Sequence, residues 1–277
     1  MLTDYHIHTT FCDGKNSAEE IAEKAHGLGF CCLGFSGHSY TPVKSDYYGP
    51  DTPDYSMTPE KTEAYRKEIS RLKVIYANKG LDIFLGLEKD YISTDNEKDF
   101  DYCIGSVHYL ELEGEAVEID VSTPEKLLCI SDKYFNGDFD ALAEKYYETV
   151  GNLGERVNFD IIGHFDLIMK QCERGGFRMT ERYLAAAKNA IDKLIPFGKP
   201  FEINVGAINR GYRTTPYPDK TLLAYIKEKG GKIVINGDCH SIDHLGKNRE
   251  IAVNLAKKCG FTTQYVLTKD GWMDIPL

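Results

Sequence analysis

The chain has 277 residues, of which 42% are hydrophobic and 27% are charged, and this composition excludes an intrinsically disordered protein. Lys and Arg number 33 against 43 Asp and Glu, and the resulting net charge of −10 argues against a nucleic-acid or anionic-membrane surface. No run approaches the roughly 18 apolar residues of a membrane helix, and no apolar leader is apparent. We therefore expect a cytoplasmic protein whose eight cysteines are reduced.

Short apolar segments rich in β-branched and aromatic residues recur along the chain and are predicted to be strands. They span residues 2–8, 31–36, 81–87, 102–107, 159–163, 200–205 and 232–236, with a weaker eighth candidate at 263–267. Helical patterns occur at residues 17–28, 58–78, 140–152, 180–195, 219–229 and 247–258. Ser17 and Glu20 match a capping box, and Thr58 followed by Pro59 is a favourable helix start.

Strands that alternate with helices predict a parallel sheet with helices outside it. Seven or eight such units over residues 1–277 indicate one α/β domain, built as a closed or nearly closed (β/α) barrel. Two connections, at residues 37–57 and 108–139, are long. Long loops in compact domains are either excursions over a functional site or surface insertions, and both readings stay open here.

Six of the eight histidines lie at or just after the C-terminal end of a predicted strand, and carboxylates take equivalent places. These residues are His6, His8, Asp13, His38, Glu88, His108, His164, Asp238 and His240. Because the C-terminal strand ends of a parallel barrel converge on one rim, we expect all nine to meet there. Imidazole and carboxylate are the usual ligands of zinc, iron and manganese, so the pattern predicts a multinuclear metal site. His26 and His244 lie off the pattern and are not expected to be ligands.

The formal charge of the predicted metal site indicates the charge of the substrate. Three carboxylates against three divalent ions would leave a formal charge of +3, and one bridging hydroxide would reduce it to +2. A phosphate monoester dianion would neutralise that charge. The arithmetic favours a phosphate ester substrate if three ions are bound.

The nine residues, in this order and spacing, resemble the PHP (polymerase and histidinol phosphatase) superfamily over nearly the whole chain. Residues 163–167 and 201–204, with Tyr217-Pro218 downstream, resemble the histidinol-phosphate phosphatases within it. The resemblance implies a distorted, TIM-like (β/α)7 barrel and a trinuclear centre at the C-terminal strand ends. It implies three ligand sets: His6, His8, Glu88 and Asp238; then Glu88, as a bridge, with His108 and His164; and finally Asp13, His38 and His240.

The same resemblance implies hydrolysis of L-histidinol phosphate to L-histidinol and inorganic phosphate. A hydroxide bridging two ions beside Glu88 would be the nucleophile, and Asp13 or His240 would protonate the leaving alkoxide. Candidate phosphate and substrate contacts are Ser39, Lys170, Asn204 and Arg210. The tyrosines of residues 37–57 are candidates for a wall against the imidazole, and Asp46, Asp51 and Asp54 are candidates to attract the amine.

Three other readings are open at this stage. A PHP phosphoesterase acting on a nucleotide or another small phosphate ester would differ only in a substrate panel. An amidohydrolase also begins with an HxH motif, but Glu88, His38 and the Asp238-Cys239-His240 run depart from its pattern. A non-catalytic PHP-like module would be expected to have lost ligands, and none is missing.

Overall fold

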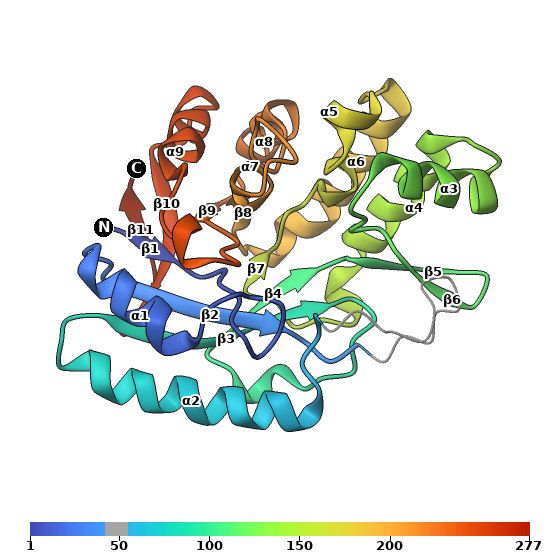
Figure 1. Ribbon diagram of the computed structural model, residues 1–277. Helices are drawn as coiled ribbons and strands as arrows, with labels where there is room; N and C mark the ends of the chain where they lie inside the picture. Colours follow the sequence, from blue (N-terminus) through green and yellow to red (C-terminus); the bar gives the residue numbers. More distant parts are fainter. Residues whose placement is uncertain (42–54) are drawn as a thin grey trace.

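Seven parallel strands form the central sheet, in the order β1-β2-β3-β4-β7-β8-β9 (Figure 1). They are β1 (Thr3–Asp4), β2 (Cys32–His38), β3 (Asp82–Asp90), β4 (Tyr102–Ser106), β7 (Ile161–Ile162), β8 (Phe201–Asn204) and β9 (Ile233–Asn236). The structure is a computed structural model that describes residues 1–41 and 55–277. Every neighbouring pair of strands is parallel, as the alternation of strands and helices predicts.

The first and last strands of this sheet approach each other, so that the sheet nearly closes into a barrel. At the seam, the backbone N–H of Cys239 donates to the carbonyl of His6, and that of His8 donates to the carbonyl of Cys239, both at 2.9 Å. Directly after β1, the Tyr5 N–H donates to Oδ1 of Asn236, the last residue of β9, at 2.9 Å. The predicted TIM-like barrel of seven strands is confirmed.

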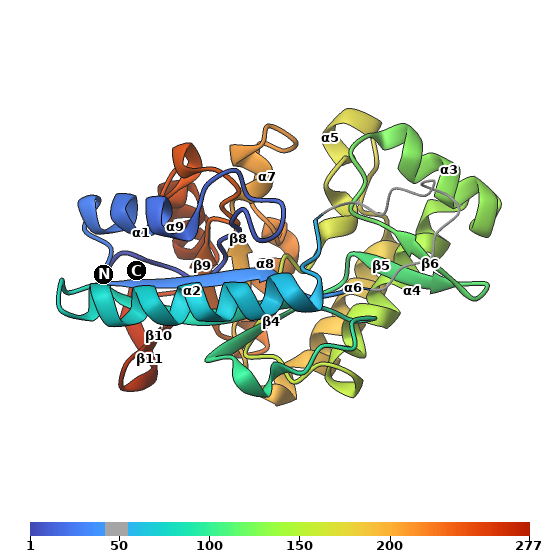
Figure 2. The same cartoon turned by 60° about the horizontal axis from the view of Figure 1, so that its bottom comes forward.

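Helices lie outside the sheet and connect its strands (Figures 1 and 2). They are α1 (Ala18–Gly27), α2 (Pro59–Ala77), α3 (Pro124–Phe135), α4 (Phe139–Gly151), α5 (Cys172–Gly175), α6 (Glu181–Leu194), α7 (Gly206–Asn209), α8 (Lys220–Glu228) and α9 (Arg249–Lys258). The two helix caps predicted from the sequence are confirmed. Ser17 and Glu20 form the capping box of α1, and Thr58 caps α2 with Pro59 in the first turn.

The connection at residues 108–139 contains more regular structure than the sequence pattern predicts. Strands β5 (Tyr109–Leu112) and β6 (Glu115–Glu118) form an antiparallel hairpin, and α3 follows. Glu113 and Gly114 at the hairpin turn both have positive φ, at 51° and 86°. Such a two-residue turn matches the right-handed twist of the strands. Figure 1 shows the hairpin to one side of the barrel, next to α3 and α4.

The weaker eighth strand candidate is a strand, but it lies outside the barrel. It forms β10 (Thr263–Thr268), which pairs antiparallel with β11 (Gly271–Pro276). The Tyr5 hydroxyl donates to the Leu267 carbonyl at 2.6 Å and ties this hairpin to the first barrel strand. The barrel therefore has seven strands and not eight.

Tyr102 fills the barrel interior towards the N-terminal end of β4. Its hydroxyl donates to the Tyr5 carbonyl at 2.6 Å and lies 3.1 Å from the Phe35 carbonyl. Gly34 and Gly86 on the neighbouring strands leave room for the ring, because a Cβ at either position would overlap it. This packed layer lies at the opposite end of the barrel strands from the predicted ligands.

Candidate metal centre

The C-terminal ends of the strands carry the predicted ligands. His38 is the last residue of β2 and is paired in register with Glu88 of β3. His6 and His8 follow β1, and a spacing of two along an extended chain turns both side chains to the same face. The remaining strand ends supply His108 after β4, His164 after β7, and Asp238 and His240 after β9.

Four groups of these side chains could each hold a metal ion, since their ligand atoms lie within 4.8 Å of one another. The groups are His8, Asp13, His38 and His240; His6, His8 and Asp238; His6, Glu88 and His164; and His38, Glu88 and His108. Together they contain all nine residues that the sequence predicts as ligands. Asp13 and His240 are the more exposed members, and the others are buried.

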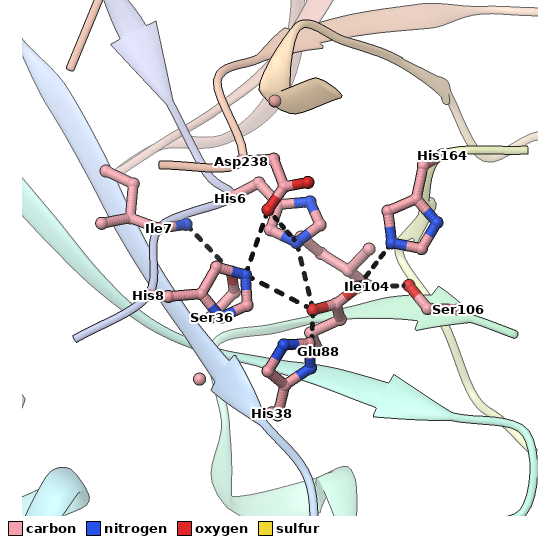
Figure 3. Close-up of polar contacts among 12 residues, drawn as sticks. His6, Ile7, His8, Ser36, His38, Glu88, Ile104, Ser106, His164 and Asp238 are labelled. Atoms are coloured by element: carbon pink, nitrogen blue, oxygen red, sulfur yellow. Dashed lines mark hydrogen bonds and ion pairs between the residues drawn. The ribbon is translucent and has the colours of Figure 1, made fainter. Parts of the chain in front are cut away.

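One cluster of four atoms has the spacing of ligands around a single ion (Figure 3). Glu88 Oε2 lies 3.2 Å from His6 Nε2 and 3.5 Å from His8 Nε2. Asp238 Oδ1 lies 3.3 Å from His8 Nε2 and 3.8 Å from His6 Nε2. Around a tetrahedral cation with bonds of about 2.1 Å, neighbouring ligand atoms are about 3.4 Å apart. These four contacts lie within about 0.4 Å of that spacing.

Three of these four atoms lack hydrogen-bond partners. His6 Nε2, His8 Nε2 and Glu88 Oε2 are buried, and none of the three forms a hydrogen bond. Buried polar atoms are nearly always paired, and each unpaired one costs about 1–3 kcal/mol. A cation that accepts these lone pairs removes that cost, so the donor set fits a metal ion.

The two oxygens of Glu88 face different imidazoles. Its Oε1 lies 2.8 Å from His164 Nε2 and 3.3 Å from His108 Nε2, and it also accepts a hydrogen bond from Ser106 Oγ at 2.7 Å. Its Oε2 faces His6 and His8. A carboxylate in this position can bridge two ions.

Asp13 contacts two histidines of its group, His240 and His38, at the rim of the barrel. Its Oδ2 lies 3.1 Å from His240 Nε2, and its Oδ1 lies 3.7 Å from His38 Nε2. The other nitrogen of His38, Nδ1, is 3.0 Å from Glu88 Oε2. His38 thus lies between the rim group and the buried carboxylate.

Two further carboxylates contact imidazoles of the candidate ligands, and neither carboxylate was predicted from the sequence. Asp90 Oδ2 lies 3.1 Å from His108 Nδ1, and Glu202 Oε1 lies 2.6 Å from His6 Nδ1. Both contacts leave the Nε2 atom of the imidazole for a metal. Strand periodicity could have identified Asp90, because this residue lies two positions after Glu88 and so points to the same face of the strand.

The buried charges favour a cation. Burial opposes ionisation of Glu88, but the imidazoles of His6 and its neighbours hold the pKa of this carboxyl well below its usual value. Burial likewise opposes ionisation of Asp238, and the Arg210 guanidinium is the largest factor that keeps its pKa low. A carboxylate binds a metal ion in its ionised form, so both groups are in the state that a metal site requires.

A cavity of about 170 Å³ opens beside the metal-ligand groups. Its lining includes seven of the nine candidate ligands together with Tyr55, Glu118, Asp120, Leu167 and Arg210. Glu118 and Asp120 come from the end of β6 and the residues after it. The hairpin in the second long connection therefore contributes two carboxylates to the cavity.

Two of the four predicted substrate contacts, Arg210 and Lys170, lie at or next to the cavity. Arg210 lines the cavity, where its Nη2 donates to Asp238 Oδ2 at 2.9 Å. Lys170 lies next to the lining and donates to Asp120 Oδ1 at 2.6 Å.

Ser39 and Asn204 lie behind the site. Ser39 Oγ accepts from the Asp90 N–H at 3.1 Å, and the Asn204 amide is engaged by Glu202 and the Gly206 N–H. Neither side chain lines the cavity.

The remaining expectations from the sequence concern two histidines, the cysteines, membrane helices and the first long connection. His26 and His244 belong to none of the four groups, as expected. All eight cysteines are free. Among residues 1–41 and 55–277, no helix has both the length and the apolar character that crossing a bilayer requires. Tyr47, Tyr48 and the candidate amine-binding carboxylates Asp46, Asp51 and Asp54 lie outside the described residues.

Comparison with known proteins assigns the chain to a family. The PHP domain profile matches residues 4–205. The chain belongs to the PHP domain family. Two relatives of this PHP protein, from Schizosaccharomyces pombe and Deinococcus radiodurans, are each named "Probable histidinol-phosphatase" and are each 28% identical to it. The alignments cover 97% and 95% of the PHP protein described here, and 90% and 95% of the two relatives.

Solved structures share the fold of this PHP protein. A protein from Listeria monocytogenes superimposes with a TM-score of 0.76 at 22% identity, covering 90% of this chain and 99% of that one. A histidinol phosphate phosphatase from Lactococcus lactis, complexed with zinc, L-histidinol and phosphate, superimposes with a TM-score of 0.67 at 20% identity. That match covers 98% of both chains.

Proposed function

We propose that this PHP protein is a metal-dependent phosphomonoesterase that hydrolyses L-histidinol phosphate to L-histidinol and inorganic phosphate. The observation that carries the proposal is the lining of the cavity, where the metal-ligand groups, Arg210, Glu118 and Asp120 occur together. L-Histidinol phosphate has a phosphate dianion on C1, a protonated amine on C2 and an imidazole at the far end. The names of the relatives and the ligands of the Lactococcus lactis protein support the same substrate.

We propose that three ions bind, with Glu88 shared between the first two. The ligand sets are His6, His8, Glu88 and Asp238; Glu88, His108 and His164; and Asp13, His38 and His240. When bound, zinc, iron or manganese at these residues supplies Lewis acidity and lowers the pKa of coordinated water. The distances from the two Glu88 oxygens to the imidazoles on either side support the shared position.

Arg210 is the proposed phosphate-binding cation. Its guanidinium donates to the ligand Asp238, and its Nη1 lies 3.3 Å from both ring nitrogens of His240. A phosphate held by the metal centre would therefore meet the guanidinium directly. The planar fork of Arg matches two phosphate oxygens, and a guanidinium stays protonated throughout the working pH range.

The proton for the leaving alkoxide is proposed to come from the rim of the site. Asp13 and His240 are the two candidates, and they contact each other at 3.1 Å. Each of them also contributes to the third ligand set. Their greater exposure suits proton exchange with solvent, and a positioned acid of this kind accelerates alkoxide departure.

Glu118 and Asp120 are proposed to receive the protonated amine. The charge of Asp120 is partly balanced already, because Lys170 donates to its Oδ1 at 2.6 Å. Burial opposes ionisation of Asp120, but Lys170 and His108 lower its pKa to about 2. Burial raises the pKa of Glu118 to about 7, so an ammonium group beside it would restore its ionised form.

The imidazole of the substrate is proposed to lie against Tyr55. This ring lines the cavity, packs edge-on against His38 with ring centroids 4.9 Å apart, and stacks on Tyr109 at 6.1 Å. A flat aromatic wall suits a planar imidazole.

The experiment that tests the proposal is steady-state phosphate release from L-histidinol phosphate, compared with nucleotides, sugar phosphates and an aryl phosphate. The metal content of the same sample is measured. We expect L-histidinol phosphate to lead in kcat/KM by several orders of magnitude. Equal rates across the panel would leave a PHP phosphoesterase of another specificity and would contradict the substrate assignment.

A further inference from the structure

We propose that Glu202 is a positioning residue of the metal centre, which fixes the proton of His6 on Nδ1 and so presents His6 Nε2 to the metal. Glu202 lies in β8, is fully buried and does not line the cavity. The inference rests on the metal site of the proposed function and is independent of the substrate.

Four nitrogen atoms surround the Glu202 carboxylate. Oε1 lies 2.6 Å from His6 Nδ1 and accepts from Asn236 Nδ2 at 2.9 Å. Oε2 accepts from the backbone N–H of His164 at 2.8 Å and from Asn204 Nδ2 at 2.9 Å. Two contacts on each oxygen use the acceptor capacity of an ionised carboxylate in full.

The two asparagines cannot turn their oxygens towards Glu202. Asn236 Oδ1 accepts the backbone N–H of Tyr5 at 2.9 Å, and Asn204 Oδ1 accepts that of Gly206 at 2.8 Å. Since a backbone N–H can only donate, each amide must present its NH2 group to Glu202. Three of the four partners of Glu202, the two amide groups and the His164 N–H, can therefore only donate to it.

This donor shell decides the tautomer of His6. Glu202 accepts from these three donors, and as an ionised carboxylate it has no proton to give, so the short contact with His6 is satisfied by a proton on Nδ1. His6 Nε2 then keeps its lone pair, and this is the atom that has no hydrogen-bond partner and faces Glu88 Oε2 at 3.2 Å. Ligand histidines commonly donate their second N–H to a carboxylate in this way.

Glu202 also joins the parts of the barrel that carry the ligands. Its partners come from the segments after β1 and β7 and from β8 and β9, which include both sides of the barrel seam. Through His6 and His164 it contacts two members of one metal-ligand group. One side chain therefore fixes an imidazole directly and a second ligand through its backbone.

The first test is Glu202→Gln, which keeps the size of the side chain. A glutamine offers one oxygen and one NH2 group, so two of the four donors would face another donor. We expect the zinc affinity, measured by competition with a chelator, to fall about 10- to 100-fold. The matched control is Asp101→Asn, a carboxylate outside the site that accepts the Leu85 N–H at 2.7 Å. It should leave zinc affinity unchanged. Wild-type zinc affinity in Glu202→Gln would overturn the proposal.

A second measurement needs no variant. Long-range ¹H–¹⁵N spectra of the zinc-loaded wild-type protein should show His6 protonated on Nδ1, and a proton on Nε2 would overturn the proposal. If Glu202→Gln does not fold, this spectrum decides. Failure to hydrolyse L-histidinol phosphate would refute the substrate only, whereas failure of the wild-type protein to bind zinc, iron or manganese would refute the metal centre and this inference together.

Discussion

His38 and Glu88 are paired in register on β2 and β3, and His38 Nδ1 lies 3.0 Å from Glu88 Oε2. Adjacent parallel strands are about 4.8 Å apart, so side chains on one face at the same register can reach one ion. The register of the sheet, and not a flexible loop, sets the spacing of this pair of proposed ligands.

Replacing Glu88 by glutamine tests the shared carboxylate. The change keeps the shape of the side chain but removes the charge that two ligand groups share. We expect kcat to fall by at least ~100-fold, because even residues that only orient metal ligands cause losses of 10- to 100-fold. Phosphate release and zinc content are measured on the same sample. Glu63→Gln, on an exposed part of α2, is the control, and a Glu88→Gln enzyme with wild-type turnover would refute the assignment.

Replacing Arg210 by alanine tests phosphate binding. A hydrogen bond to a charged group contributes about 1.5–3 kcal/mol, which corresponds to a loss of about 10- to 150-fold in kcat/KM. Inorganic phosphate should also become a weaker inhibitor, since the same guanidinium holds the product. Arg210→Lys should recover only part of the loss, because an ammonium lacks the planar fork. Unchanged kinetics in Arg210→Ala would remove this residue from the site.

The pH dependence of substrate binding tests Glu118. Burial raises the pKa of this carboxyl to about 7, so it becomes neutral as the pH falls through that value and loses its attraction for an ammonium group. We expect KM for L-histidinol phosphate to rise between pH 8 and pH 6, relative to KM for an analogous phosphate that lacks the amine. Glu118→Gln should abolish that difference. A ratio of KM values that stays constant with pH in the wild-type enzyme would contradict the assignment.

Removal of metal should lower thermal stability. An ion that binds only the folded state stabilises it by about 4 kcal/mol at ~1,000 times its dissociation constant. For a chain of this size that corresponds to roughly 10 °C in Tm. Scanning calorimetry of the chelator-treated protein, before and after zinc is restored, measures the shift. Identical Tm values would show that the nine side chains bind no zinc.

Packing around Tyr102 gives a prediction that is independent of function. The Cβ that Gly86→Ala adds would overlap the Tyr102 ring, and we expect this overpacking to destabilise the fold by about 1–3 kcal/mol. Gly27, at the end of α1, has open space around the same atom, so Gly27→Ala should be neutral or slightly stabilising. Urea denaturation of both variants measures the difference. Equal stabilities would contradict the described packing.

Much of the metal centre could be predicted before any coordinates, because its residues follow a local rule. Residues such as His108 and His164 come directly after apolar segments, and strand ends of a parallel barrel must converge. The capping residues Ser17 and Thr58 could also be predicted from the sequence, since a helix start depends on neighbours within one turn.

The cavity wall was harder to predict. Glu118 reaches the cavity at the end of the β5–β6 hairpin, within a connection whose regular structure the sequence pattern did not reveal. Segment 263–267 shows the converse, since it has the pattern of a barrel strand but pairs with β11 outside the barrel. Strand periodicity identifies a strand but does not identify its partner.

The sequence by itself determined the barrel, the ends of its strands and the nine side chains that meet there, because alternation, caps and strand-end positions are properties of short segments. Only the tertiary structure decided what surrounds those side chains. Glu202 is one carboxylate in an apolar strand, and its four donors come from segments near both ends and the middle of the chain. A hydrogen-bonded shell of that kind exists only after the barrel has closed, so no local pattern could encode it.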